Sequence, residues 1–137
     1  MQEKVVKVEA QANSTTGGHL LDTGMEVKTG QTLRVRALFN DTWSADSGGR
    51  ISNANGLGNP KGETFGLYTA NGFSFLYGCL VGSLDGGKTM FPVGTEMIMQ
   101  NLGATGTLSL GYWDSDHSNN SGSVSAEVTV SGEPASL

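Results

Sequence analysis

The segment DSDHSNNSG, Asp114–Gly122, concentrates oxygen-bearing side chains in one short stretch. Two aspartates, Asp114 and Asp116, are followed closely by the amides Asn119 and Asn120. Calcium takes roughly six to eight oxygen ligands from carboxylates, amides and main-chain carbonyls. No glutamate closes the segment in the EF-hand pattern, and no helical pattern flanks it. The segment therefore predicts a calcium site held by a loop.

Two other interpretations of this loop stay open. Asp and Asn are frequent in turns because their side chains accept hydrogen bonds from their own backbone, so the loop could be a solvated turn without an ion. A transition-metal site around His117 is the third interpretation. A single imidazole without a nearby Cys or second His gives it the weakest support.

The segments on both sides of the loop alternate apolar and polar side chains, as half-buried strands do. We expect similar strands at Lys4–Ala12, in two runs within 24–38, and at Phe75–Leu84, Thr95–Gln100, Gly106–Trp113 and Gly122–Gly132, with an Asp-Gly hairpin at Asp85–Lys88. No segment has the spacing of an amphipathic helix. The sequence thus predicts an all-β fold, a small jelly-roll-like β-sandwich of about eight short antiparallel strands. We assign residues 1–137 to a single β-sandwich domain.

Two regions carry more specific expectations. Phe75–Leu84 is almost continuously apolar, which is typical of an inner strand. Asn40–Thr64 is rich in Asn, Gly and Ser and lacks periodicity, which predicts a long functional loop. Trp43, within that stretch, indicates local order because an indole ring needs a packing surface.

Composition narrows the function. The net charge of −5 and the pI near 4.8 argue against nucleic acid or an anionic membrane surface as a partner. The apolar runs are too short to insert into a bilayer. Cys79 is the only cysteine and is expected in the core. No signal peptide is visible in Met1–Gln11, which fits a cytoplasmic protein, release without a classical signal, or a domain of a secreted protein.

A family resemblance rests mainly on TLSLGYWDSDHSNNSGSVSAEV, and within it on NNSGSVS, Asn119–Ser125. This segment is similar to the C-terminal part of the bacterial calcium-dependent galactophilic lectins, the PA-IL-like family. GQTLRVRALFNDTWSADSG and GCLVGSLDGGKTMFPVGT resemble two further pieces of that family in the same order. The likeness extends from about residue 24 to residue 130.

The resemblance implies a small jelly-roll sandwich with one calcium ion, to which the vicinal hydroxyls of a galactose-like sugar bind. Residue by residue, it implies side-chain ligands from Asp114, Asn119 and Asn120. One main-chain carbonyl would come from within Ser115–Ser118, with Ser118 as a candidate, and another from near Asp46. The resemblance also implies a carbohydrate partner and allows a homo-oligomer.

This chain departs from the family pattern in three places. The loop between Asp114 and Asn119 is shorter, and its second acid, Asp116, is a further candidate ligand. The loop around Trp43 has extra residues. The family's His-Pro-x-Gln segment, which touches the sugar, has no counterpart between residues 53 and 64.

Besides the candidate metal ligands Asp46, Asp114, Asn119 and Asn120, the sugar-contacting set includes Trp43 and His117. Sugars stack their apolar faces on aromatic rings, which is the reason for Trp43. The sequence brings no pair of acids together for glycoside hydrolysis, so we expect no enzyme. We predict a calcium-dependent lectin. The alternative is a structural or assembly domain of a larger surface or secreted protein, in which calcium only stiffens a loop.

Overall fold

The computed structural model describes residues 1–46, 50–57, 67–101, 103 and 105–134, and in these it contains strands, turns and loops only. The strands are β1 (Gln2–Glu9), β2 (Leu21–Val27), β3 (Thr32–Ala37), β4 (Trp43–Ser44), β5 (Ile51–Ser52), β6 (Leu67–Ala70), β7 (Phe73–Leu76), β8 (Leu80–Ser83), β9 (Phe91–Pro92), β10 (Glu96–Gln100), β11 (Gly106–Tyr112) and β12 (Ser121–Ser131). In this part of the chain no helix is long and apolar enough to cross a membrane. The predicted all-β sandwich is confirmed.

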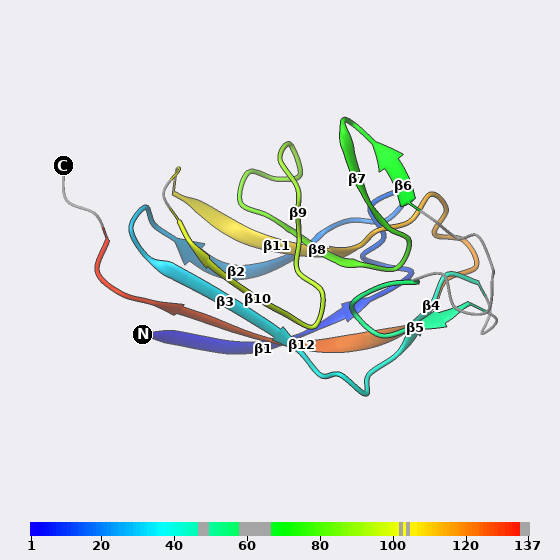
Figure 1. Cartoon of the computed structure of the whole chain (residues 1–137), viewed down its shortest axis with the longest axis horizontal. Coiled ribbons are helices and arrows are strands. Elements are labelled where there is room, and N and C mark those ends of the chain that lie inside the picture. Colours follow the sequence, from blue (N-terminus) through cyan, green and yellow to red (C-terminus); the bar gives the residue numbers. More distant parts are fainter. Residues whose placement is uncertain (47–49, 58–66, 102, 104, 135–137) are drawn as a thin grey trace.

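Two antiparallel sheets form the layers of the sandwich (Figure 1). The larger sheet has the order β10-β3-β12-β4-β5, and β1 pairs with the opposite edge of β12. The smaller sheet has the order β2-β11-β8-β9, and the hairpin β6-β7 is separate from both. The long strand β12 pairs first with β4 and then with β3, so it ties the loop-bearing end of the sandwich to its centre.

The main core lies between the two sheets. In β3, Leu33, Val35 and Ala37 are buried and alternate with exposed residues, as the sequence predicts. Trp43 packs edge-on against Tyr112, with ring centroids 4.5 Å apart. Fully burying one apolar side chain such as Leu33 or Val35 stabilises the fold by about 1.5–3 kcal/mol. Because several such residues alternate along one strand, their burial fixes which face of the strand turns inward.

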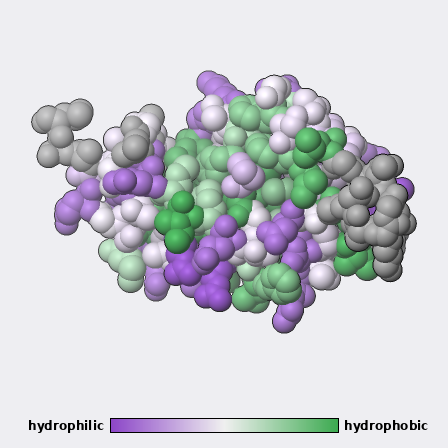
Figure 2. All heavy atoms as spheres, viewed as in Figure 1, coloured by the Kyte–Doolittle hydropathy of each residue, from purple (hydrophilic) through white to green (hydrophobic). Residues whose placement is uncertain are grey.

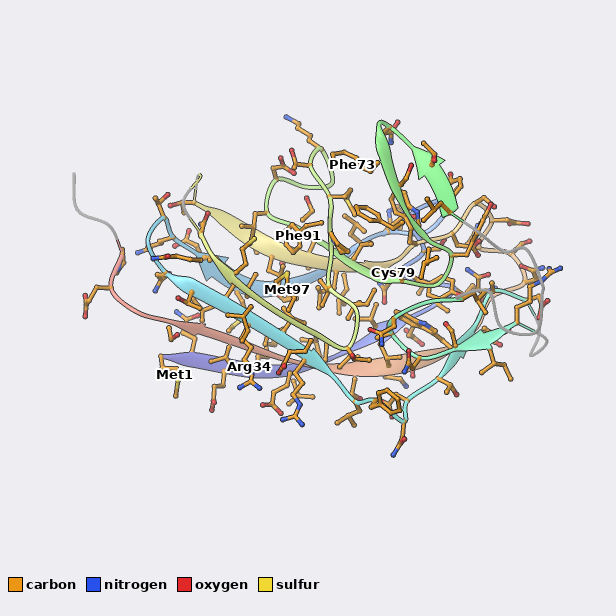
Figure 3. The ribbon with its side chains drawn as sticks, viewed as in Figure 1. Met1, Arg34, Phe73, Cys79, Phe91 and Met97 are labelled. Atoms are coloured by element: carbon orange, nitrogen blue, oxygen red, sulfur yellow. The ribbon has the colours of Figure 1, made fainter. Side chains whose placement is uncertain are left out.

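A second, smaller cluster covers the other face of the smaller sheet. It contains the buried residues Cys79, Val81, Met90 and Trp113, and the hairpin β6-β7 packs over it (Figure 3). Burial raises the pKa of the Cys79 thiol to about 11, as expected for a core cysteine rather than a nucleophile. The visible face of the molecule is apolar along its middle and hydrophilic along its lower edge (Figure 2).

Two sequence expectations need correction. Phe75–Leu84 is not one inner strand, because the chain turns between β7 and β8 at Gly78, whose φ is +80°. The left-handed backbone at this position turns the chain, and glycine adopts it without a steric penalty. The described residues also form twelve strands instead of about eight, because Phe75–Leu84 contributes to two strands and because β4, β5, β6 and β9 lie outside the predicted strands. β4 and β5 lie inside the aperiodic stretch 40–64. Residues 47–49 and 58–64 of that stretch lie outside the described residues.

Candidate metal and ligand site

Asp114 follows β11, and its backbone is held by a residue from a distant part of the chain. The hydroxyl of Thr15 accepts a hydrogen bond from the N–H of Asp114 and donates one to its carbonyl, each at 3.3 Å. Next to this contact, Ser14 forms a parallel bridge with Tyr112. Thr15 therefore holds both polar groups of the Asp114 backbone, its N–H and its carbonyl.

The carboxylate of Asp114 is buried, and the residue is only 4% exposed. Its Oδ1 accepts a hydrogen bond from the N–H of Ser115 at 2.8 Å, whereas Oδ2 has no hydrogen-bond partner. Burial raises the pKa of Asp114 above its ordinary value, and the hydrogen bond from the N–H of Ser115 offsets part of this effect. The site thus holds a carboxylate whose charge is incompletely compensated.

Asn120 closes the loop from the other side and is also buried, at 5% exposure. Its Nδ2 donates to the carbonyl of Ala10 at 2.9 Å, and its N–H donates to the carbonyl of His117 at 3.1 Å. The other atom of the amide, Oδ1, has no hydrogen-bond partner. The side chain lies close enough to Asp114 to lower the pKa of that carboxyl group.

Two buried oxygens, one from Asp114 and one from Asn120, are therefore unpartnered. Across the described residues, the hydroxyl of Tyr112 is the only other buried side-chain N or O atom in this condition. An unsatisfied buried acceptor costs about 1–3 kcal/mol, and a hard cation relieves that cost. The donor set fits calcium, which accepts amide and carbonyl oxygens. Within the same residues no three of His, Cys, Asp and Glu group together as a metal site.

The middle of the loop is organised differently. Asp116 is exposed, and its two carboxylate oxygens accept hydrogen bonds from the N–H and hydroxyl of Ser118 at 3.0 and 3.1 Å. These bonds lower the pKa of Asp116. The carbonyl of Ser118 accepts a bond from Gln11 at 3.1 Å, and Asn119 is exposed beside it. Asp116 thus has the arrangement of a solvated Asx turn, while Asn119 stands at the rim.

His117 packs against the segment that carries Thr15. A Cβ atom on Gly17 would lie 2.1 Å from Nδ1 of His117, so the half-buried ring occupies the space that a side chain would need. Gly17 also has a φ of +86°, which favours glycine. His117 is therefore positioned at the loop, with one part of its ring against the backbone.

Asp46 lies on the neighbouring loop, after β4. Its carboxylate accepts the N–H of Arg50 at 2.9 Å and pairs with the Arg50 guanidinium at 3.5 Å, while its carbonyl accepts a bond from the hydroxyl of Ser44. Burial first, and then the charges of Asp114 and Asp46, raise the pKa of Tyr112. The Tyr112 hydroxyl therefore lies beneath both loops, which the fold brings to the same end of the sandwich.

Trp43 lies below this end and not at its surface. The residue is 1% exposed, and its indole N–H donates to the carbonyls of Asn53 and Gly78 at 3.2 and 3.0 Å. With its ring against Tyr112, Trp43 has no exposed face on which a sugar could stack. Its place in the structure is that of a support for the two loops.

Sequence reasoning missed the residues that brace the site from the segment 10–19. Thr15 and the carbonyl of Ala10 hold the two buried ligand candidates, and Gln11 holds the loop between them. They lie about a hundred residues earlier in the chain, at separations of 99, 110 and 107 positions. No local pattern signals such a pairing, because it arises only when the segment after β1 meets the end of β11 and the start of β12.

Comparison with known proteins supports the fold. No family model and no curated protein matches the sequence. Among solved structures, the chain is similar to the N-terminal domain of EclA, described as a PllA-like lectin. The match has a TM-score of 0.67 and 24% sequence identity, and it covers 93% of this chain and 95% of the other. The protein thus has the β-sandwich fold of a lectin domain.

Proposed function

We propose that this protein is a non-enzymatic, calcium-dependent lectin domain that binds galactose or a related sugar through vicinal hydroxyls. The observation that carries the proposal is the pair of buried, unpartnered oxygens on Asp114 and Asn120. The likeness in fold to a domain described as a lectin supports the carbohydrate class. The resemblance of Asn119–Ser125 to the galactophilic lectins supports the sugar and the metal.

In this proposal, Asp114 supplies the charge and Asn120 a neutral oxygen from the buried side of the site. Asn119 adds an amide oxygen from the exposed side, and main-chain carbonyls within Ser115–Ser118 and near Asp46 complete the set. When bound, calcium would supply open coordination positions that two neighbouring sugar hydroxyls can take in place of water. Asp116 would join only by giving up its bonds to Ser118, so we place it last among the candidates.

The remaining residues would orient the ligands. Thr15 holds the backbone of Asp114, and Ala10 holds the amide of Asn120, so that both oxygens are directed before any ion binds. His117 lies beside the exposed part of the loop and is the side chain that we expect to contact the sugar. A single small site of this kind binds weakly, and a homo-oligomer would raise its avidity.

A glycan array tests this function. Labelled protein is applied in millimolar calcium and again in excess EGTA, with Asp114→Ala as the site variant and Asp85→Ala as a control from another loop. We expect galactose-terminated glycans to be bound in calcium only, by wild type and by Asp85→Ala. Calcium-dependent stabilisation without binding to any glycan would overturn the lectin proposal and favour the structural domain.

A further inference from the structure

A pocket of about 380 Å³ lies on the face of the smaller sheet that points away from the main core. It opens between the hairpin β6-β7, the segment Thr15–Thr16 and the turn between β8 and β9. Figure 3 labels Phe73 on the side of the hairpin that borders this turn. The volume of the pocket lies in the range of pockets that hold small molecules.

The lining of the pocket combines aromatic rings with neutral polar groups. Tyr68, Phe73 and Trp113 contribute rings, while Thr16 and Asn71 contribute a hydroxyl and an amide. None of the described residues that line the pocket is charged. A ligand that matches this surface has apolar C–H faces, several hydroxyls and no charge, which is the chemistry of a neutral pyranose.

The walls of the pocket are fixed in position. The indole N–H of Trp113 donates to the carbonyl of Tyr68 at 2.8 Å, and the ring centroids of these two residues are 5.3 Å apart. The Tyr68 hydroxyl also bonds to Thr16, at 3.3 Å. At the tip of the hairpin, Asn71 and Gly72 both have positive φ, as in a tight type I′ turn. A ligand therefore enters a largely formed cavity and orders little chain on binding.

The pocket is separate from the candidate metal site although the two are neighbours in sequence. Tyr112 belongs to the main core and Trp113 to the smaller cluster, because successive side chains of a strand point to opposite faces. Asp114 then follows with its carboxylate buried at the loop. Thr15 touches both places, since it lines the pocket and bonds to the backbone of Asp114.

We propose that this pocket is a second carbohydrate-binding site, which takes one neutral pyranose residue without calcium. Tyr68 and Phe73 would cover the apolar face of the ring, and the Thr16–Tyr68 hydroxyl pair would exchange hydrogen bonds with its hydroxyls. No charged group is needed, so the site does not depend on the metal ligands. The test of this second site is therefore independent of the test of the calcium-dependent function.

The test is a titration of the protein, in excess EDTA, with the methyl glycosides of galactose, glucose, mannose and fucose. NMR reads the methyl group of Met90 and the indole N–H of Trp113, which both line the pocket. We expect saturable shifts of both signals with at least one glycoside. The absence of a shift with all of them, or a shift that requires calcium, would overturn the proposal.

Matched variants locate the binding. Ala70→Trp fills the pocket, whereas Thr69→Trp adds the same bulk on the exposed side of the same strand. Ala70→Trp should abolish the shifts and Thr69→Trp should retain them. Tyr68→Phe keeps the ring, removes one hydroxyl and should weaken binding roughly two- to tenfold, the equivalent of one neutral hydrogen bond. It also serves as the second test if Ala70→Trp does not fold. Unchanged binding in Ala70→Trp, or in Tyr68→Phe, would contradict the assignment.

Discussion

Two loops of this protein carry an aspartate just after a strand of the same sheet, but the two carboxylates differ in burial and in hydrogen bonding. After β8, Oδ1 of Asp85 accepts hydrogen bonds from the hydroxyl of Ser83 and the N–H of Thr89, both at 2.8 Å. Asp85 is exposed, and these bonds lower its pKa. After β11, Asp114 is buried, one of its oxygens is unpartnered, and burial raises its pKa.

The comparison separates a turn from a candidate binding site. Asp85 is satisfied by its own loop and needs nothing more. The backbone of Asp114 is held by Thr15, and the second oxygen of its buried carboxylate has no donor, as is true of the buried amide oxygen of Asn120. The loop after β11 has more oxygen-bearing side chains than the loop after β8, but an aspartate two residues after the strand is common to both, so its position alone does not distinguish them. What distinguishes them is whether the hydrogen bonds are complete.

The largest expected effect is the loss of calcium-dependent stabilisation in Asp114→Ala. A ligand that binds only the native state stabilises it by about 2.7 kcal/mol at a hundred times its Kd. We expect wild type to show a gain of this order in thermal or urea unfolding, and Asp114→Ala to show none. Asn120→Ala should behave in the same way, while Asn119→Ala should lose less because it removes a neutral group at the exposed rim.

The Asp85→Ala variant sharpens this result. It removes the acceptor that completes the turn after β8, so its stability without calcium should fall. Its gain on adding calcium should nevertheless equal that of wild type. If Asp85→Ala and Asp114→Ala lost the calcium-dependent stabilisation equally, the two loops would not differ in calcium binding, and this would contradict the proposed site.

The next effect concerns the brace on Asp114. Thr15→Val keeps the shape of the side chain but removes both bonds to the backbone of Asp114. Leaving these groups unpaired should lower the free energy of unfolding by about 1–2 kcal/mol and weaken calcium binding without abolishing it. Thr23→Val, which removes a buried hydroxyl bonded to Leu108 away from the loop, should cost stability but leave calcium affinity unchanged. Equal calcium affinity in wild type and Thr15→Val would remove Thr15 from the site.

A smaller effect is expected in the pH dependence of the metal-free protein, with opposite signs for the two aspartates. The raised pKa of Asp114 means that its ionised form destabilises the fold at neutral pH, and that this penalty disappears as the pH falls through the raised pKa and below the ordinary one. Asp114→Asn should therefore be more stable than wild type at neutral pH in chelator, with no advantage in acid.

For Asp85 the sign is reversed. Its lowered pKa, caused mainly by the N–H of Thr89 and then by Ser83, means that its ionised form stabilises the fold above the ordinary pKa. That contribution is lost as the pH falls through the lowered pKa. Asp85→Asn should be less stable than wild type at neutral pH, and the difference should shrink in acid. Urea unfolding across this pH range checks both variants, and like signs for the two would contradict the account.

The smallest expected effect belongs to Asp116. Because its oxygens are already bonded to Ser118 and the residue is exposed, Asp116→Ala should change both calcium affinity and stability only slightly. A loss of calcium binding as large as that of Asp114→Ala would show that the shortened loop recruits Asp116 as a ligand. The calorimetric calcium affinity of the two variants decides between these outcomes.

Much of the fold follows from alternation in the sequence. In β3, β11 and β12, period-two patterns predict the buried faces, including Leu33, Leu110 and Val128. The break at Gly78 escapes this reasoning because apolar residues continue on both sides of it, first in the cluster under the hairpin and then in the main core. The strands β4 and β5 have two residues each, too few to show a period.

The candidate site is predictable only in part. The residue types of Asp114–Asn120 indicate an oxygen-rich loop, and Asp114 and Asn120 are among the predicted ligands. Which side chains turn inward is not readable from their spacing. Asp114 and Asn120 are buried and Asp116 and Asn119 exposed because Thr15 and Ala10 fix the two ends from a distant segment.

The decisive measurement for the proposed calcium site is a calorimetric titration of calcium into chelator-treated wild type. The same titration is carried out on Asp114→Ala after this variant has been shown to be folded. We expect saturable binding by wild type that Asp114→Ala lacks, because the buried oxygens of Asp114 and Asn120 would form the inner half of the proposed site. Absence of calcium binding by the wild type, or equal binding by the two proteins, would show that Asp114–Asn120 is a polar turn like the loop after β8.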